Sequence, residues 1–178
     1  MTTPHPDDDA LLSPEPGWTP LGDWPFLNKR PPGRFVSGDP SGTRFRLRYY
    51  RDAAAPHVCH GKIIFGPGAE GPPLHAHGGA IAALLDEALG ITCWFAGHPV
   101  TTAQLNTRFI QMVPLNQVIW LESRIEDEGG EGRRSVQVRG RLFNPETGED
   151  YASATATFVR LSPRAVEIFR KKLASRSS

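Results

Sequence analysis

Two adjacent glycines and an aspartate carry the chemistry that this sequence suggests most clearly. Gly78 and Gly79 directly follow His77, and Asp86 lies seven residues beyond Gly79 in a largely apolar run. Backbone N–H groups at a helix start lack intrahelical acceptors and carry partial positive charge, so they can hold a carbonyl oxygen as it becomes an oxyanion. A carboxylate two turns along could act as a nucleophile or as the base for water. Together these groups point to acyl transfer.

The spacing places Gly79 and Asp86 on one face of one helix. A rise of about 1.5 Å per residue puts Asp86 roughly 10 Å from Gly79, and its side chain leans back to leave a gap of about 7 Å. That gap is near the limit for one carbonyl to reach both groups. A site shared between two subunits would relax this constraint. The structural alternative is a tight turn at the glycines and an Asp86 that caps a neighbouring strand.

The helix that must position these groups is predicted from Gly78 to about Phe95, before Gly97 and Pro99. Its apolar residues fall on every face, and such a helix is expected to be buried all round. A short amphipathic helix is predicted over 164–173. Runs rich in β-branched and aromatic residues predict strands at 43–50, 57–65, 101–110, 117–125, 133–143 and 151–161. The order predicts an α+β fold in which a mostly antiparallel sheet wraps around one helix.

Charge and cysteine content exclude several function classes. The 178 residues carry a net charge of +1, which provides no basic field for nucleic acid. No apolar run is expected to reach the roughly 18 to 20 residues of a membrane span, and the N-terminus does not have the pattern of a secretory or transit segment. Cys59 and Cys93 cannot form a disulfide framework, so we expect a reducing, cytoplasmic compartment.

Proline divides the chain into an arm and a main domain. Nine of the 17 prolines lie within the first 40 residues, where they disfavour helices and central strands. We expect residues 1–33 to form a Pro-rich arm, disordered to about residue 10 and extended after it. Residues 34–162 would form the main domain and residues 163–178 a C-terminal helix and tail. Trp18 and Trp24 would anchor the arm, either on its own domain or over a subunit interface or ligand mouth.

The sequence gives little support for a metal site or for a serine hydrolase. His57, His60, His75 and His77 with Cys59 suggest a metal site, but His57 and His60 are three apart on a predicted strand and therefore face opposite sides. No further cluster completes a tetrahedral ligand set. The sequence has no Gly-x-Ser-x-Gly elbow, which argues against a serine hydrolase. We expect no metal and no cofactor.

The motif around the glycines resembles the HGG…D signature of hotdog-fold acyl-CoA thioesterases. The signature is carried by His77-Gly78-Gly79-Ala80 and Leu84-Leu85-Asp86-Glu87-Ala88. The chain is similar to the phenylacetyl-CoA thioesterase-like group, and more closely to the thioesterase-superfamily-member-4-like subgroup. The closer match rests on Phe65-Gly66-Pro67 leading to Gly71-Pro72-Pro73, His75 to Gly79, Thr102-Ala103-Gln104-Leu105-Asn106 and Pro114-Leu115. The resemblance covers roughly residues 43–161.

This resemblance implies a hotdog thioesterase domain. In that α+β fold, a curved antiparallel sheet of five to six strands wraps around one long buried helix, in a homodimer or homotetramer whose sites draw on two subunits. It implies that Asp86 is the catalytic carboxylate and that Gly79, with Gly78 beside it, polarises the thioester carbonyl. Thr102 would line the site, where its hydroxyl could position water. We expect His77 to order the loop. Direct attack and water activation by Asp86 both stay open.

An acyl-CoA substrate would bring phosphates to the mouth of such a site. Arginine binds phosphate through paired donors, and the candidates are Arg133 and Arg134 in a Gly-rich turn and Arg108 on the strand that follows Thr102. Asn106 on the same strand is a further substrate-binding candidate. The alternative for the arginines is an ordinary solvated strand end.

The sequence therefore predicts an acyl-CoA thioesterase that hydrolyses a thioester to a free carboxylic acid and CoA, as in lipid metabolism. Its expected partners are the acyl-CoA substrate and further copies of the chain, with no nucleic acid and no membrane span. The alternative is a non-catalytic acyl-CoA-binding, acyl-binding or assembly protein on the same fold, with the arm covering a partner surface. The presence of both acting groups favours the enzyme.

Overall fold

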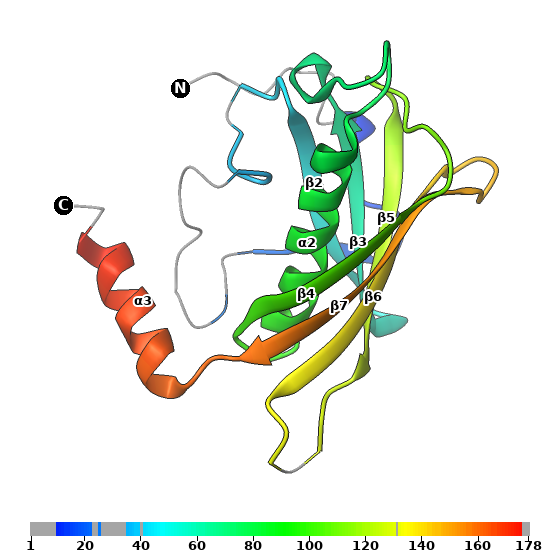
Figure 1. Ribbon diagram of the computed structural model, residues 1–178. Coiled ribbons are helices and arrows are strands. Elements are labelled where there is room, and N and C mark those ends of the chain that lie inside the picture. The colour runs from blue at the N-terminus through cyan, green and yellow to red at the C-terminus, as the bar shows by residue number, and fades with distance from the viewer. Residues whose placement is uncertain (1–9, 23–24, 26–34, 40, 131, 176–178) are drawn as a thin grey trace.

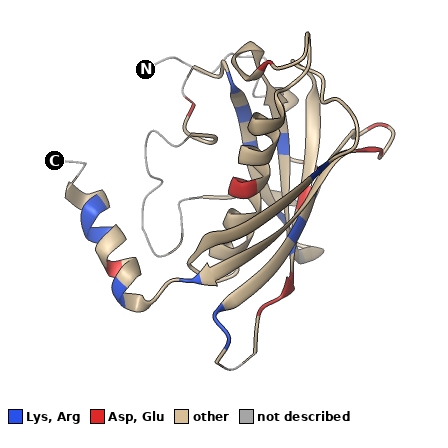
Figure 2. Cartoon of the chain, viewed as in Figure 1, with Lys and Arg blue, Asp and Glu red and all other residues tan. Residues whose placement is uncertain are grey.

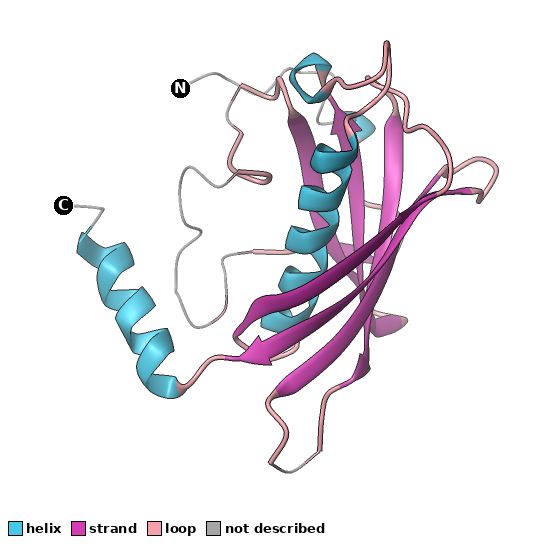
Figure 3. Ribbon diagram, in the orientation of Figure 1, coloured by secondary structure: helices cyan, strands magenta, loops and turns pink. Residues whose placement is uncertain are grey.

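One curved sheet encloses one long helix (Figures 1 and 3). A computed structural model describes residues 10–22, 25, 35–39, 41–130 and 132–175. The sheet is antiparallel with the strand order β1-β2-β3-β5-β6-β7-β4, and α2 (Gly78–Phe95) lies against its concave face. The α+β hotdog architecture is confirmed. The disorder expected to about residue 10 lies outside the described residues except at Ala10, which with Leu11 forms a helical turn rather than disordered or extended chain, and the anchor expected at Trp24 also lies outside them.

The strands run close to their predicted positions, with one addition. The other elements are β1 (Trp18–Pro20), β2 (Phe45–Asp52), β3 (Ala55–Phe65), the 3-10 turn η1 (Pro67–Ala69), β4 (Val100–Phe109), β5 (Val118–Asp127), β6 (Ser135–Phe143), β7 (Asp150–Arg160) and α3 (Pro163–Ser175). The described sheet has seven strands rather than five to six. The additional strand, β1, lies in the Pro-rich arm, and it tolerates Pro20 because an edge strand does not need every N–H donor.

Strand alternation separates an apolar inner face of the sheet from a polar outer face. On β6, Val136, Val138 and Leu142 are buried toward α2, whereas Arg139 and Arg141 point outward. The helix completes the core with a set of fully buried side chains, namely Leu84, Leu85, Ala88, Leu89 and Cys93. Burial of a leucine side chain contributes roughly 1.5–3 kcal/mol, so this enclosure accounts for much of the driving force of folding.

The helix is not buried all round within one chain, contrary to expectation. A strip of small residues with one acid stays partly exposed on the side away from the sheet, namely Gly79, Ala82, Ala83, Asp86 and Gly90. Asp86 and Glu87 are the only charged residues of α2 (Figure 2). With 18 residues and a mean hydropathy of 1.3, α2 does reach the length and composition of a membrane span. In this fold it packs as the core helix of the sheet.

The described part of the arm packs on its own domain, over the outer face of β2, β3 and β5. Trp18 stacks on His60 with ring centroids 4.3 Å apart, and it also contacts Trp120. Glu15 forms an ion pair of 2.6 Å with the buried Lys62. A hydrogen bond from the Tyr50 hydroxyl to the Leu12 carbonyl completes the attachment. The arm is thereby fixed by stacking, charge and backbone pairing.

His77 forms the N-cap of α2. Its Nδ1 accepts the Gly79 N–H at 2.9 Å, while its carbonyl oxygen accepts from the N–H groups of Ala80 and Ile81. Its own N–H donates to the Ala69 carbonyl at 2.7 Å, which ties the helix start to η1. These contacts fix the point at which the loop becomes helix.

Replacement of His77 by alanine should destabilise the fold through loss of this cap. We expect the free energy of unfolding to fall by about 1 kcal/mol, which is typical of a lost N-cap, and His77→Asn to restore most of it because asparagine caps well. Urea denaturation measures both changes. His75→Ala is the control, since His75 bonds to Pro73 outside the helix and should matter little. A His77→Ala protein as stable as wild type would contradict the cap's contribution.

The docked arm should make stability depend on pH through His60. Burial lowers the pKa of His60 below 6.5, although Glu122 and Asp52 partly oppose this. Because the folded-state pKa is depressed, the stabilising contribution is present above the unfolded-state pKa and is lost as pH falls from there through the folded-state pKa. Between about pH 7.5 and about pH 5.5, the urea midpoint should fall more in wild type than in His60→Phe, which still stacks but cannot be charged.

His57→Phe is the matched control for this measurement, because His57 is exposed on the same strand. It should keep the wild-type pH dependence. Identical pH dependence in His60→Phe and wild type would rule out His60 as the source.

Candidate active site

The predicted carboxylate and hydroxyl lie in direct contact. Asp86 projects from the middle of α2, and the Oγ1 of Thr102 on β4 donates a hydrogen bond of 2.8 Å to its Oδ1. Thr102 pairs with Phe158 of β7, whose ring is in the core, so the two residues share the face of the sheet that carries α2. Residues 16 positions apart in sequence are thus joined because the edge strand passes beside the open face of the helix.

This hydrogen bond engages only one oxygen of the Asp86 carboxylate, so the other oxygen can still accept a proton or attack a carbonyl carbon. Within the described residues, Oδ2 of Asp86 has no hydrogen-bond partner, and the carboxylate is only partly buried. The Thr102 hydroxyl donates its proton to Asp86, so its oxygen can still accept a hydrogen bond from a water molecule. A carboxylate with one oriented and one free oxygen suits a general base or a nucleophile.

The N–H donors at the helix start differ from the simplest expectation. Gly79 gives its N–H to the His77 ring, whereas the Gly78 N–H has no acceptor among the described residues. The Phe109 ring covers Gly78, since a Cβ built on that glycine would lie 3.4 Å from the ring. Because its N–H has no described acceptor, Gly78 is the available donor at the helix start. The Gly79 N–H would become available if the His77 ring turned away. The role of Gly79 stays a prediction.

Two of the predicted substrate-binding residues lie on the opposite face of the sheet from Asp86. Asn106 pairs with Thr155, and Arg108 pairs with Ser153, on the outer face. Simple alternation would place both on the side of Thr102, but β4 has an irregularity between Thr102 and Gln104. The extra residue of such a bulge reverses the faces beyond it. One chain therefore does not bring Asn106 and Arg108 to Asp86.

The other two predicted substrate-binding residues lie near the far end of α2. Arg133 and Arg134 follow the turn between β5 and β6, which Figure 1 places at the opposite end of the helix from Gly78. Arg133 approaches Asp127 at 3.8 Å, and Arg134 donates to the Arg160 carbonyl at 2.7 Å. Their contacts are those of a strand end, and within one chain they are remote from the helix start.

Sequence reasoning missed an exposed apolar cluster beside the helix start. Leu74, Phe109 and Met112 are 75%, 54% and 63% exposed. Backbone bonds from Ala76 to Val113 and from Leu115 to Leu74 hold the two loops together. Leu74 has a φ of 63°, which is unusual for a bulky residue. The apolar residues after β4 were the available signal, but only the fold shows that they meet the loop before α2.

The cysteines are poorly suited to catalysis. Burial raises the pKa of Cys59 and of Cys93 to about 12, so each thiol stays protonated near neutral pH. In the described part of the chain, no three His, Cys, Asp or Glu side chains are grouped as metal ligands would be. The Asp86–Thr102 pair is thus the best-placed reactive constellation among the described residues.

Comparison with known proteins agrees with the fold and with the motif. Residues 75–151 match the family model of the thioesterase superfamily. The chain is 31% identical over 118 residues to human acyl-coenzyme A thioesterase THEM5, covering 56% of this chain and 46% of that protein. It is 32% identical over 129 residues to THEM4 of Xenopus laevis, covering 70% and 54%. The chain therefore spans about half the length of these curated relatives.

Solved structures resemble the same region. A thioesterase superfamily protein has a TM-score of 0.57 and 27% identity, covering 64% of this chain and 53% of that one. A hypothetical thioesterase protein from Streptococcus pneumoniae, solved with coenzyme A, has a TM-score of 0.56 and 18% identity, covering 67% of this chain and 90% of that one. The second likeness concerns the fold alone. Together with the family match and the two relatives, these findings place this chain in the thioesterase superfamily.

Proposed function

We propose that the chain is an acyl-CoA thioesterase, which hydrolyses a thioester to a free carboxylic acid and CoA. The observation that carries this proposal is the 2.8 Å hydrogen bond between Thr102 and Asp86 on the open face of α2. It joins the carboxylate of the HGG…D motif to the threonine of the strand motif. The names of the THEM4 and THEM5 relatives and the coenzyme A in the Streptococcus pneumoniae structure support the substrate class.

The geometry suggests the following course of reaction. The thioester carbonyl oxygen accepts the N–H of Gly78, joined by Gly79 if the His77 ring turns away. Asp86 takes a proton from a water held by Thr102, and the water oxygen bonds to the carbonyl carbon. The carbon–sulfur bond then breaks, and the CoA sulfur leaves with the pair of electrons and is protonated. Direct attack by Asp86, through an anhydride that water opens, stays the alternative.

Loss of the carboxylate should remove most of the activity. We expect Asp86→Asn to lower kcat by about 10²- to 10⁴-fold, the usual contribution of a general base. Thr102→Val should lower it about 10- to 100-fold, because a hydrogen bond to a charged group is lost. Steady-state hydrolysis of short, medium, long and aromatic acyl-CoAs, followed by thiol release, measures both effects.

Thr101→Val is the matched control, because Thr101 is exposed beside Thr102 and should leave kcat unchanged. If no acyl-CoA were hydrolysed but one bound, the alternative of an acyl-CoA-binding or assembly protein would replace the enzyme. Unchanged turnover in Asp86→Asn would refute only the assignment of Asp86.

We infer that two copies of the chain associate through β4 and the open face of α2. Among the described strands, β4 pairs only with β7, so its other edge presents unpaired backbone groups. Proteins cover such edges to prevent uncontrolled pairing. The exposed apolar side chains Leu74, Phe109, Ile110 and Met112 lie at one end of this edge, and large apolar patches mark interaction surfaces. A homotetramer would use a further surface.

A charge at the centre of that apolar cluster should separate the subunits. We expect Phe109→Glu to shift the chain from dimer to monomer in light scattering coupled to size exclusion, because a buried carboxylate without a partner is costly. If the site draws on both subunits, turnover should fall as well. Phe169→Glu on α3 is the control, since Phe169 is also exposed but lies on another element. An unchanged mass for Phe109→Glu would place the interface elsewhere.

We propose that the protein works in a reducing compartment. Both Cys59 and Cys93 are free and buried, which fits a reducing compartment such as the cytoplasm.

A further inference from the structure

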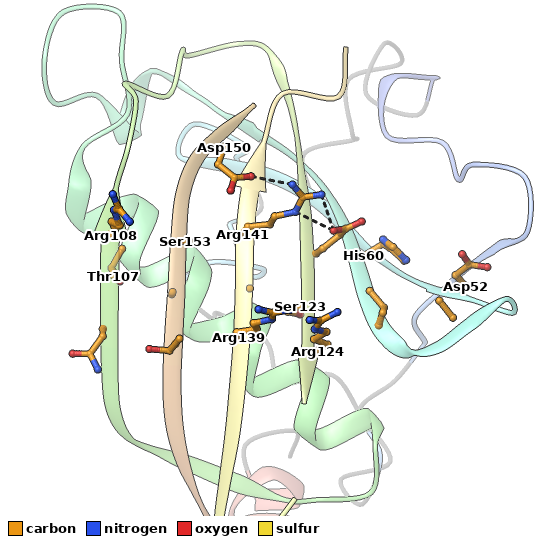
Figure 4. Close-up of a pocket in the computed structure, with 17 residues that line it drawn as sticks. Asp52, His60, Thr107, Arg108, Ser123, Arg124, Arg139, Arg141, Asp150 and Ser153 are labelled. Carbon is orange, nitrogen blue, oxygen red and sulfur yellow. Dashed lines mark hydrogen bonds and ion pairs between the residues drawn. The ribbon is translucent and has the colours of Figure 1, made fainter. Parts of the chain in front are cut away.

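A cavity lies on the outer face of the sheet, away from α2. It has a volume of about 950 Å³ and extends across β3, β5, β6, β7 and β4 (Figure 4). Cavities of roughly 300–1,000 Å³ are typical of sites for small molecules. Within one chain, the proposed thioesterase mechanism uses none of the arginines that line this cavity. The presence of these arginines therefore requires a separate explanation.

Strand register arranges the cavity wall in two rows. One row runs from β3 to β4 through paired residues, namely Val58, Arg124, Arg139, Thr155 and Asn106. The adjacent row follows in the same way through His60, Glu122, Arg141, Ser153 and Arg108. Since alternate residues of a strand share a face, both rows point outward. The arginines thus lie beside short polar side chains that leave space above the sheet.

The first row places two like charges opposite each other. Arg124 and Arg139 are direct partners on β5 and β6, and Figure 4 shows their side chains next to one another. Like charges at directly opposed positions destabilise a sheet. Arg139 forms an ion pair of 2.7 Å with Glu126, whereas Arg124 has no acidic partner in the described part of the chain. An anion bound between them would remove the repulsion.

In the second row, acidic neighbours neutralise one of the two arginines. Arg141 bonds to Glu122 and to Asp150, each at 3.0 Å, so its charge is already matched. Arg108 has no ion pair with any described residue. Arg124 and Arg108 therefore carry the positive charge that has no ion pair with a described acid, and Arg139 shares its charge with Glu126. One further acid, Asp52, lines the cavity at its β2 end.

A buried polar side chain without a partner lines the same cavity. His60 is 7% exposed, and neither of its ring nitrogens has a hydrogen-bond partner among the described residues. Buried polar atoms in folded proteins are nearly always bonded. An unsatisfied imidazole at the end of a cationic groove is a feature expected of a site that receives a hydrogen-bonding ligand.

We propose that this outer groove binds a small molecule through a phosphate or pyrophosphate group, held by Arg124 and Arg139 and by the hydroxyl of Thr155. Arginine matches phosphate oxygens with parallel donors, and the hydroxyl supplies a further one. The site is separate from the thioester site, because the sheet lies between it and Asp86. It is independent of the proposed hydrolysis.

Calorimetry with the full chain tests the proposal. Inorganic pyrophosphate and ADP are the two probes, which distinguish a free anion from a nucleotide, and citrate is the polyanion without phosphorus. We expect pyrophosphate or ADP to bind more tightly than citrate, because the charge of a phosphate group is concentrated on one small centre that fits between two opposed arginines, whereas the carboxylates of citrate are spread over a carbon chain. The double variant Arg124→Gln and Arg139→Gln should lose at least about tenfold in affinity, since two charged donors are removed.

The control removes two charges elsewhere. Lys171→Gln with Lys172→Gln on the exposed α3 should bind the probes as wild type does. The arginine variant should be at least as stable to urea as wild type, because it relieves a like-charge pair. This result would separate a binding role for the arginines from a structural one. Asp86→Asn should keep wild-type affinity for the probes, which separates this test from that of the proposed function.

Several outcomes would overturn the proposal. These are the absence of binding by both phosphate probes, equal affinity for citrate, and the same loss in the lysine variant as in the arginine variant. A higher KM for acyl-CoA in the arginine variant would make the groove part of the substrate site and would refute its independence.

Discussion

Enclosure of α2 by a single curved sheet is the constraint on which the other features depend. A sheet can cover only one side of a helix, so the leucines of α2 are buried against the strands while its small residues stay partly exposed. Asp86 lies on this open side, where its charge keeps contact with solvent. The edge strand β4 passes the same side and supplies Thr102. Asp86 and Thr102 thus meet where the sheet stops covering the helix.

The two faces of the sheet carry different chemistry because alternate residues of every strand point to opposite sides. The inner face is apolar and holds the helix, and the outer face is rich in arginine. The described part of the arm covers the outer face around His60, Lys62 and Trp120. The charged rows beside it line the cavity and contribute little to the core.

The sequence predicted the features that depend on local pattern. Apolar periodicity and flanking glycines located α2 and the strands, and the motif spacing together with the family resemblance selected Asp86 and Thr102. The pattern did not reveal β1, since prolines conceal an edge strand. It also gave no sign that Asn106 and Arg108 lie on the opposite face of the sheet from Asp86, because a bulge leaves no mark in the composition. Nor could it show that His77 takes the N–H of Gly79, which depends on a ring orientation.

The irregularity in β4 also bears on how sequences of this kind should be aligned. A related strand of equal length that lacks this irregularity would align with β4 without a gap. Strict alternation from Thr102 would then place each residue aligned with Gln104 to Phe109 on the opposite face of the sheet. The residue aligned with Phe109 would leave the helix start, and the residue aligned with Arg108 would turn toward the helix. Equal length at this strand therefore does not ensure an equivalent site, whereas removal of Ala103 alone would keep the faces from Gln104 onward.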